Sequence, residues 1–110
     1  MVIYRVEHEK DSRGPYSSGI VDYRHYDNET CPSPEEDGID CAWAYHYGFK
    51  SKKDLVNWFG KDYLREFRNS NHYVYKYRVA PEDVAVGGKH VGFDIDCATR
   101  LGKVPVYKLH

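Results

Sequence analysis

The stretch that decides the fold is GFKSKKDLVNWFG, residues 48–60. It predicts a helix that begins at Ser51, because Ser51 and Asp54 can form a capping box. In that motif the Ser51 hydroxyl accepts a hydrogen bond from the Asp54 amide, and the Asp54 side chain accepts one from the Ser51 amide. Gly60 is expected to end this helix. An apolar stripe at positions i, i+3 and i+4 is formed by Leu55, Trp58 and Phe59. Because such a stripe must be covered, we expect the helix to pack on a sheet.

A second apolar stripe follows directly after Gly60. It consists of Tyr63, Leu64 and Phe67, in the segment KDYLREFRN at residues 61–69. The spacing again matches one face of a helix, and Asn69 is a residue type that often ends one. The middle of the chain is therefore predicted to hold two short helices joined tightly.

Strand patterns flank this pair of helices. Residues 72–79, HYVYKYRV, alternate cleanly, and we expect their tyrosine side to face the helices. Gly87 and Gly88 form a hairpin signal between two further strands. Pro105 places the last strand at a sheet edge. The predicted strands are residues 2–8, 72–79, 84–86, 89–95 and 103–109.

The order of these elements predicts the fold class. One strand, a long loop, two helices and then further strands argue for an α+β fold with a mainly antiparallel sheet covered by two short helices inserted mid-chain. At 110 residues and 41% hydrophobic content, the chain fits a single domain over residues 1–110 with one modest core. Eleven tyrosines supply rings both for that core and for a contact surface.

Charge is distributed unevenly along the chain, although the formal net charge is only −1. Residues 1–49 hold four basic and ten acidic side chains, net −6, whereas residues 50–110 hold twelve and seven, net +5. If the halves fold onto one another their charges neutralise, and if they segregate an acidic end and a basic end meet different partners. The basic half lacks Arg-rich runs, which argues against nucleic acid as a partner.

Cysteine usage and hydropathy indicate the compartment. Cys31, Cys41 and Cys97 are an odd number of cysteines in a chain that shows no signal peptide. No apolar run approaches the roughly 20 residues of a membrane span. We expect a cytoplasmic protein with reduced thiols and no membrane contact. Edge strands and exposed tyrosines leave a symmetric homodimer open.

No motif of high specificity for a metal, a cofactor or catalysis occurs in the sequence. No CxxC, HxxxH or HxH pair is spaced for zinc. The glycine segments GPYSSG and VGGK lack the following helix that a phosphate loop requires. We therefore predict no catalytic residues, no metal and no cofactor.

An acidic loop with repeated proline and glycine breaks spans residues 27–40 and holds six carboxylates. We identify Glu35, Glu36 and Asp37 as a candidate surface for a basic partner protein. A charged face that is simply solvated is the alternative. Ser33 can cap a short helical turn at this point.

Two side chains near the N-terminus stand out. Arg5, in the middle of the first strand, is either an exposed cation paired with Glu7 or a neighbouring strand, or a buried cation that needs an anionic partner. Tyr16 places a large ring on a loop of turn-forming residues, 9–19. There it either plugs the edge of the core or makes a contact.

Five segments form a pattern that spans nearly the whole chain: YRVEH at 4–8, GPY at 14–16, CPSPEEDG at 31–38, GFKSKKDLVNWF at 48–59 and YKYRVAPEDVAVGGKHVGFD at 75–94. In combination they resemble a group of small phage and prophage proteins. The resemblance implies an origin in a mobile element and, by analogy, a counter-defence role in the cytoplasm of the host cell.

A more distant likeness concerns the first strand IYRVE, the serine segment after it and the late segment VYKYRVAPEDVAV. Together they resemble the skeleton of an ADP-ribosyltransferase domain, in which the first two elements hold NAD. Where that family carries a glutamate, this sequence has Lys89-His90-Val91, so the resemblance implies a domain kept for binding. The candidate ligand-binding residues are Arg5, Tyr16, Ser17 and Ser18.

The sequence therefore favours a non-enzymatic binding protein of phage or prophage origin that occupies a host protein or a nucleotide-like signal. The lack of a catalytic constellation, the tyrosine content and the split charge all point to it. The alternative is an enzyme acting on NAD or a nucleotide, with Arg5, Tyr16 and Ser17 lining its pocket. A DNA mimic built on the acidic loop is a third alternative, against which the +5 charge of residues 50–110 argues.

Overall fold

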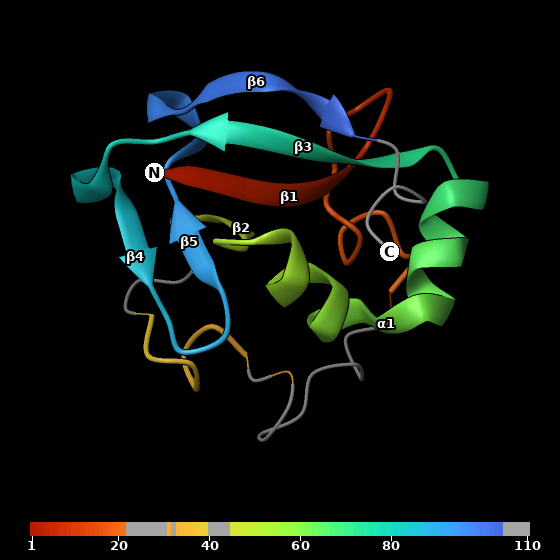
Figure 1. The fold of residues 1–110 in the computed structure, drawn as a ribbon, viewed down its shortest axis with the longest axis horizontal. Coiled ribbons are helices and arrows are strands. Elements are labelled where there is room, and N and C mark those ends of the chain that lie inside the picture. The colour runs from red at the N-terminus through yellow and green to blue at the C-terminus, as the bar shows by residue number, and fades with distance from the viewer. Residues whose placement is uncertain (22–30, 32, 40–44, 105–110) are drawn as a thin grey trace.

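The computed structural model describes residues 1–21, 31, 33–39 and 45–104 (Figure 1). Its helix and strands, in chain order, are β1 (Val2–His8), β2 (His46–Gly48), α1 (Lys52–Asn69), β3 (His72–Arg78), β4 (Val84–Val86), β5 (Val91–Phe93) and β6 (Thr99–Val104), with single 3₁₀ turns at Pro81–Asp83 and Ile95–Cys97. All four strand pairs among these elements are antiparallel. The predicted α+β class with antiparallel strands is confirmed.

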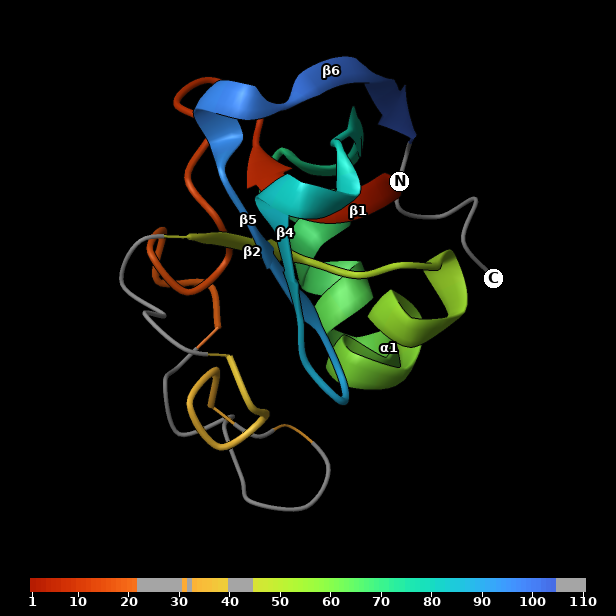
Figure 2. The same ribbon diagram turned by 90° about the vertical axis from the view of Figure 1, so that its left-hand side faces the viewer.

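The strands form two three-stranded sheets that meet at one point. The first has the order β1-β3-β6 and the second the order β2-β5-β4. Reciprocal backbone hydrogen bonds of 2.8 Å between Tyr4 and Phe49 join β1 to the end of β2. Beyond that bridge the sheets diverge, and β4 and β5 run across the direction of β1 and β3 (Figure 1 and Figure 2).

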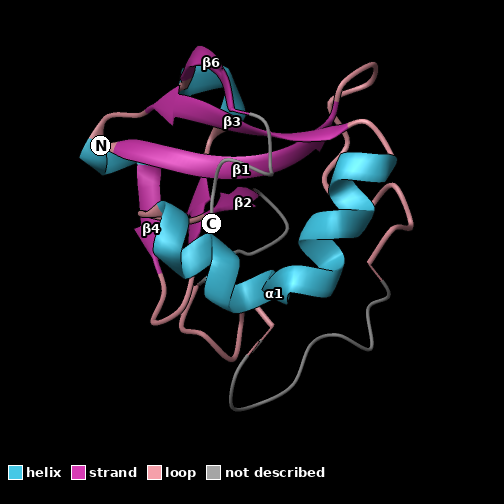
Figure 3. Cartoon of the chain, turned by 45° about the vertical axis from the view of Figure 1, so that its right-hand side comes forward, coloured by secondary structure: helices cyan, strands magenta, loops and turns pink. Residues whose placement is uncertain are grey.

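The helix begins where the sequence predicts. Ser51 is its N-cap, in extended conformation, and its hydroxyl accepts from the Asp54 amide at 3.1 Å. The two predicted helices are joined into one element, α1, which is interrupted at Gly60, where a φ of 80° and a ψ of 168° are not helical. That φ favours glycine, since a Cβ would be strained there. Figure 3 shows the two segments of α1 meeting at an angle.

Both faces of β1 and β3 are buried, each under a different layer. One face carries Val6 and Val74 and packs against α1. Neighbouring residues of a strand point to opposite sides, so Tyr75 and Tyr77 lie on the other face. There they pack with Phe93 of β5. The expectation that the tyrosine side of β3 faces the helix is therefore wrong, because alternation alone cannot say which layer covers which side.

The last strand starts earlier than the predicted 103–109. β6 begins at Thr99 and pairs with β3, and among the described strands it stands at the end of the order β1-β3-β6, as expected for an edge. Residues 105–109 lie outside the described part of the chain. The hairpin predicted at Gly87 and Gly88 is confirmed, since it links β4 to β5.

The acidic and basic parts of the chain fold onto one another. Glu9 lies 3.5 Å from Lys103, and Glu7 pairs with Arg100. Of the cysteines, Cys31 is buried and its thiol donates to the Trp58 carbonyl at 3.3 Å. Cys97 is exposed, and Cys41 lies outside the described residues. In the part of the chain that is described, no helix has the length and apolarity needed to cross a membrane.

Candidate functional site

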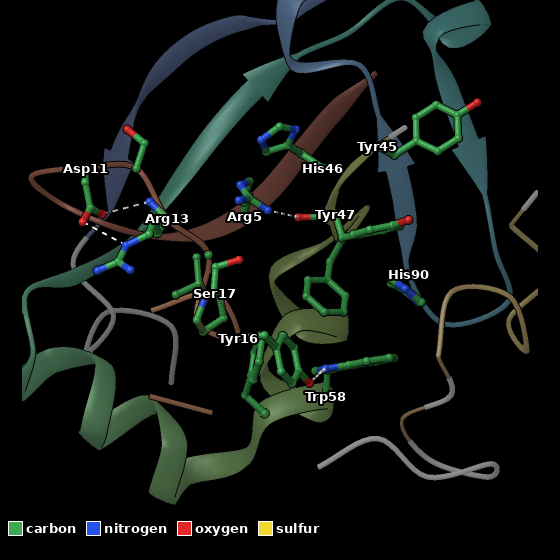
Figure 4. A pocket seen from close by; sticks show the side chains of 16 residues that line it. Arg5, Asp11, Arg13, Tyr16, Ser17, Tyr45, His46, Tyr47, Trp58 and His90 are labelled. Carbon is green, nitrogen blue, oxygen red and sulfur yellow. Dashed lines mark hydrogen bonds and ion pairs between the residues drawn. The ribbon is translucent and has the colours of Figure 1, made fainter. Parts of the chain in front are cut away.

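A cavity of about 520 Å³ opens where β1 and β2 part. Next to the bridge between Tyr4 and Phe49, the strands no longer exchange backbone hydrogen bonds. Instead the Arg5 side chain crosses the gap, and its Nη1 donates to the Tyr47 carbonyl at 3.0 Å (Figure 4). The described residues around the cavity come from β1, the loop 11–17, β2, the first half of α1 and the β4–β5 hairpin.

Arg5 forms part of the cavity wall and is held by a buried anion. The residue is 9% exposed, and its Nε lies 2.9 Å from Oε2 of Glu7, which is 1% exposed. Glu7 also accepts a hydrogen bond of 2.6 Å from the Tyr77 hydroxyl and pairs with Arg100. Burial, together with the hydrogen bond to Glu7, raises the pKa of Tyr77 to about 12. Of the two alternatives for Arg5, the structure has the buried cation with its anionic partner.

One end of the cavity is polar and basic. Asp11 accepts from the Arg13 amide at 3.1 Å and from Arg13 Nε at 3.0 Å, and the backbone hydrogen bond is the main reason why the pKa of Asp11 is lowered. Ser17 and His46 line the same end (Figure 4). Burial, followed by the nearby charge of Arg5, lowers the pKa of His46. Asp11 is the one carboxylate among the described lining residues, and it is already engaged with Arg13.

The other end of the cavity is aromatic. The Tyr16 hydroxyl accepts from Trp58 Nε1 at 3.0 Å. The Trp58 ring centroid lies 5.5 Å from that of Phe49 and 4.7 Å from that of His90. The ring centroid of Tyr47 lies 5.4 Å from that of His90. Burial raises the pKa of Tyr47 to about 12. This end offers flat apolar surfaces, and the other offers cationic and hydroxyl groups.

Three of the four predicted ligand-binding residues lie around this cavity. Arg5, Tyr16 and Ser17 line it, although they come from a strand and a separate loop. Tyr16 also packs against the core, which is the first of the two roles considered for it, and its role as a contact stays a prediction. Ser18 is not among the lining residues, because its hydroxyl donates to the Pro15 carbonyl at 3.2 Å and lies 2.9 Å from Nε2 of His72. Ligand binding by these residues stays a prediction.

The predicted acidic surface divides into two parts. The turn begins at Ser33, whose hydroxyl lies 2.7 Å from Oε1 of Glu36, and both Glu35 and Glu36 are exposed. The Asp37 side chain is only 4% exposed. It accepts from the amides of Lys89 at 2.8 Å and His90 at 2.9 Å. Asp37 therefore fastens the turn to the β4–β5 hairpin and is not a surface carboxylate.

Sequence reasoning missed several residues of the cavity. Arg13 lies in a turn-forming loop, and Trp58 was expected in the core alone. His90 follows Gly87 and Gly88, which were interpreted only as a hairpin signal. A Cβ at Gly87 would overlap the Asp37 carboxylate, so this glycine also marks the close approach that holds the hairpin.

Comparison with known proteins gives a phage relationship. A model of the family described as Bacteriophage T4 Y00F protein matches residues 1–107. An uncharacterized 19.7 kDa protein in the motB-dexA intergenic region of Enterobacteria phage T4 is 33% identical over 49 residues. That match covers 44% of this chain and 30% of the phage T4 protein, so the chain spans less than a third of the length of this curated relative. No solved structure matches the chain.

Proposed function

We propose that this chain, which belongs to the Bacteriophage T4 Y00F protein family, is a phage binding protein that acts in the host cytoplasm by holding a nucleotide-like small molecule. The proposal rests on one observation. A single cavity of about 520 Å³ combines aromatic rings at one end with arginines and a serine hydroxyl at the other. Holding a nucleotide signal away from its host receptor would serve a counter-defence role.

The two ends of the cavity match the two parts of a nucleotide. Aromatic side chains such as Trp58 and Tyr47 give a base a stacking surface. Guanidinium groups bind phosphate through a planar set of donors, and Arg13 is half-exposed at the polar end, within reach of a ligand. The volume lies within the range of roughly 300–1,000 Å³ that small-molecule sites occupy.

The arrangement of carboxylates favours binding over turnover. Stabilising positive charge on a reacting sugar needs a carboxylate facing it. Among the described residues near Arg5, Glu7 is buried with three partners and Asp11 is paired with Arg13. An enzyme acting on NAD or a nucleotide is the second candidate, favoured by the position of Arg5 and Ser17 on one cavity.

Isothermal titration with AMP, ADP and NAD tests the proposal, with Arg13→Gln as the cavity variant. The matched control is Arg65→Gln, since Arg65 is an exposed arginine of α1 that does not line the cavity. The wild type and the control are expected to bind at least one of the three alike, and Arg13→Gln about tenfold more weakly, the typical effect of losing a charge-assisted hydrogen bond. No binding, or equal loss in both variants, would contradict the proposal. Mass spectrometry of the mixture would reveal cleavage of NAD if the second candidate holds.

A host protein is the other partner that we propose, through the turn 33–39. Glu35 and Glu36 are exposed on it, and a basic surface would complement them. Crosslinking in lysate from infected cells, compared between the wild type and the double variant Glu35→Gln, Glu36→Gln, tests this. If the wild type and the double variant capture a partner equally, that partner binds to another surface of the protein.

A further inference from the structure

His90 carries a buried nitrogen, Nε2, whose hydrogen-bonding capacity is unused. The residue is 4% exposed, and Nε2 has no hydrogen-bond partner among the described residues, whereas Nδ1 lies 2.8 Å from Oδ2 of Asp37. Buried polar atoms are nearly always satisfied in folded proteins, since leaving them unpaired costs stability. His90 also lines the cavity, beside Tyr47 and Trp58 (Figure 4). An imidazole with one unpaired nitrogen in the wall of a cavity points to a group that the described residues do not supply.

We infer that His90 recognises the aromatic part of the ligand by accepting a hydrogen bond through Nε2, with Asp37 as the residue that positions its ring. The inference rests on the proposed function and deepens it. It names the chemistry of the ligand: a flat heterocycle that presents an N–H donor at its edge, such as the ring nitrogen or amino group of a nucleobase.

Asp37 fixes where the imidazole sits and which nitrogen carries the proton. Its carboxylate accepts from the His90 amide at 2.9 Å, and Nδ1 lies 2.8 Å from Oδ2, close but not aligned as a hydrogen bond. A carboxylate so near favours the proton on Nδ1. Burial lowers the pKa of His90 despite the opposing effect of Asp37, so the ring is neutral at pH 7. Nε2 is then left with its lone pair and serves as an acceptor.

The rings around His90 explain why an aromatic group is the expected neighbour. The centroids of Trp58, Tyr47 and Phe49 lie 4.7, 5.4 and 6.5 Å from that of His90. A base among these rings would gain stacking contacts and one directed hydrogen bond.

The test compares His90→Phe and His90→Gln with the wild type in titrations with AMP, GMP, CMP and UMP. Phenylalanine keeps a ring but removes the acceptor, and glutamine restores an acceptor near the place of Nε2. For the monophosphate that the wild type binds, we expect His90→Phe to bind about 3- to 10-fold more weakly, the effect of one lost hydrogen bond, and His90→Gln to recover part of the affinity. Thermal unfolding of free His90→Phe should occur at the same or a higher temperature than that of the wild type.

Each of the other outcomes overturns a named part of the two proposals. Equal affinity of His90→Phe and the wild type, while Arg13→Gln still weakens binding, overturns the role of His90 and leaves the proposed function standing. Weaker binding by His90→Phe together with a clearly lower unfolding temperature makes His90 a structural residue. If His90→Gln binds the monophosphate no more tightly than His90→Phe does, then His90 does not act as a hydrogen-bond acceptor. A wild type that binds none of the four monophosphates overturns the role of His90, and it overturns the proposed function as well if neither ADP nor NAD binds.

Discussion

Glu7 and His90 are both buried polar residues next to the same cavity, yet their surroundings are opposite. The Glu7 carboxylate has Arg5, Tyr77 and Arg100 around it. Nε2 of His90 has no hydrogen-bond partner among the described residues, and Asp37 lies only on the side of Nδ1. Removing one partner of a paired buried charge costs stability, and a buried polar group left unpaired costs stability already. We therefore expect the Glu7 cluster to stabilise the fold and propose ligand recognition for His90, and the predictions below test that division.

The largest effect is expected from Glu7→Ala. It would leave Arg5 buried without an anion and Tyr77 without its acceptor, which typically costs about 3–5 kcal/mol. Urea denaturation followed by tryptophan fluorescence measures the free energy of unfolding. A loss below about 1 kcal/mol, which is the range of ordinary surface substitutions, would show that the pairing of Glu7 with its three partners does not matter for stability.

A smaller effect is expected from Asp37→Ala, which removes the acceptor of the Lys89 and His90 amides. Unpaired backbone groups of this kind cost roughly 1–3 kcal/mol. Glu35→Ala, on the exposed side of the same turn, is the control and should change stability little. If both variants behave alike in urea denaturation, the turn 33–39 is not fastened through Asp37.

Lowering the pH should distinguish the contribution of His90 to stability from that of the Glu7 cluster. The pKa of His90 is lowered in the folded protein, so the unfolded chain binds a proton at a higher pH than the folded one does. The neutral ring therefore favours folding above the ordinary histidine pKa of about 6.5, and that contribution is lost as the pH falls below it. His46 and His72, whose pKa values are lowered in the same direction, add to the slope in both proteins.

The corresponding measurement is the unfolding temperature of the wild type and of His90→Phe between pH 7.5 and 5. The wild type is expected to lose more stability than the variant over this range. Parallel curves would mean that protonation of His90 is not linked to unfolding, and that the ring is not buried in neutral form.

The smallest effect is expected from Glu9→Ala. Glu9 pairs with Lys103 at 3.5 Å, but both side chains are nearly half exposed. Exposed pairs contribute about 0–1 kcal/mol, so the change in the free energy of unfolding should stay within about 0.5 kcal/mol. A loss comparable to that of Glu7→Ala would show that burial is not what distinguishes the two glutamates.

Local signals in the sequence predicted the elements, and long-range contacts decided the rest. The pairing of Ser51 with Asp54 is confined to one turn, so the start of α1 could be predicted. The sequence alone does not show whether Gly60 ends the helix or bends it, because glycine with a positive φ occurs at both kinds of position. The covered side of β3 was not predictable, because a strand buried on both faces has apolar or aromatic residues on each.

The cavity was only partly predictable for the same reason. Arg5 and Ser17 were named from a family likeness, and no periodicity would have placed them together. The contact between Asp37 and His90 joins residues 53 positions apart. It arises from the docking of a turn onto a hairpin, and a sequence pattern confined to either segment cannot reveal it.

The most direct test of the central claim is the nitrogen NMR signal of the His90 imidazole, recorded while the monophosphate that binds most tightly is added. We predict a neutral ring at pH 7.5 in the free protein, with the proton on Nδ1, and a shift of the Nε2 signal as the ligand saturates the cavity. An Nε2 signal that stays unchanged at saturation, or a proton found on Nε2 in the free protein, would contradict the account.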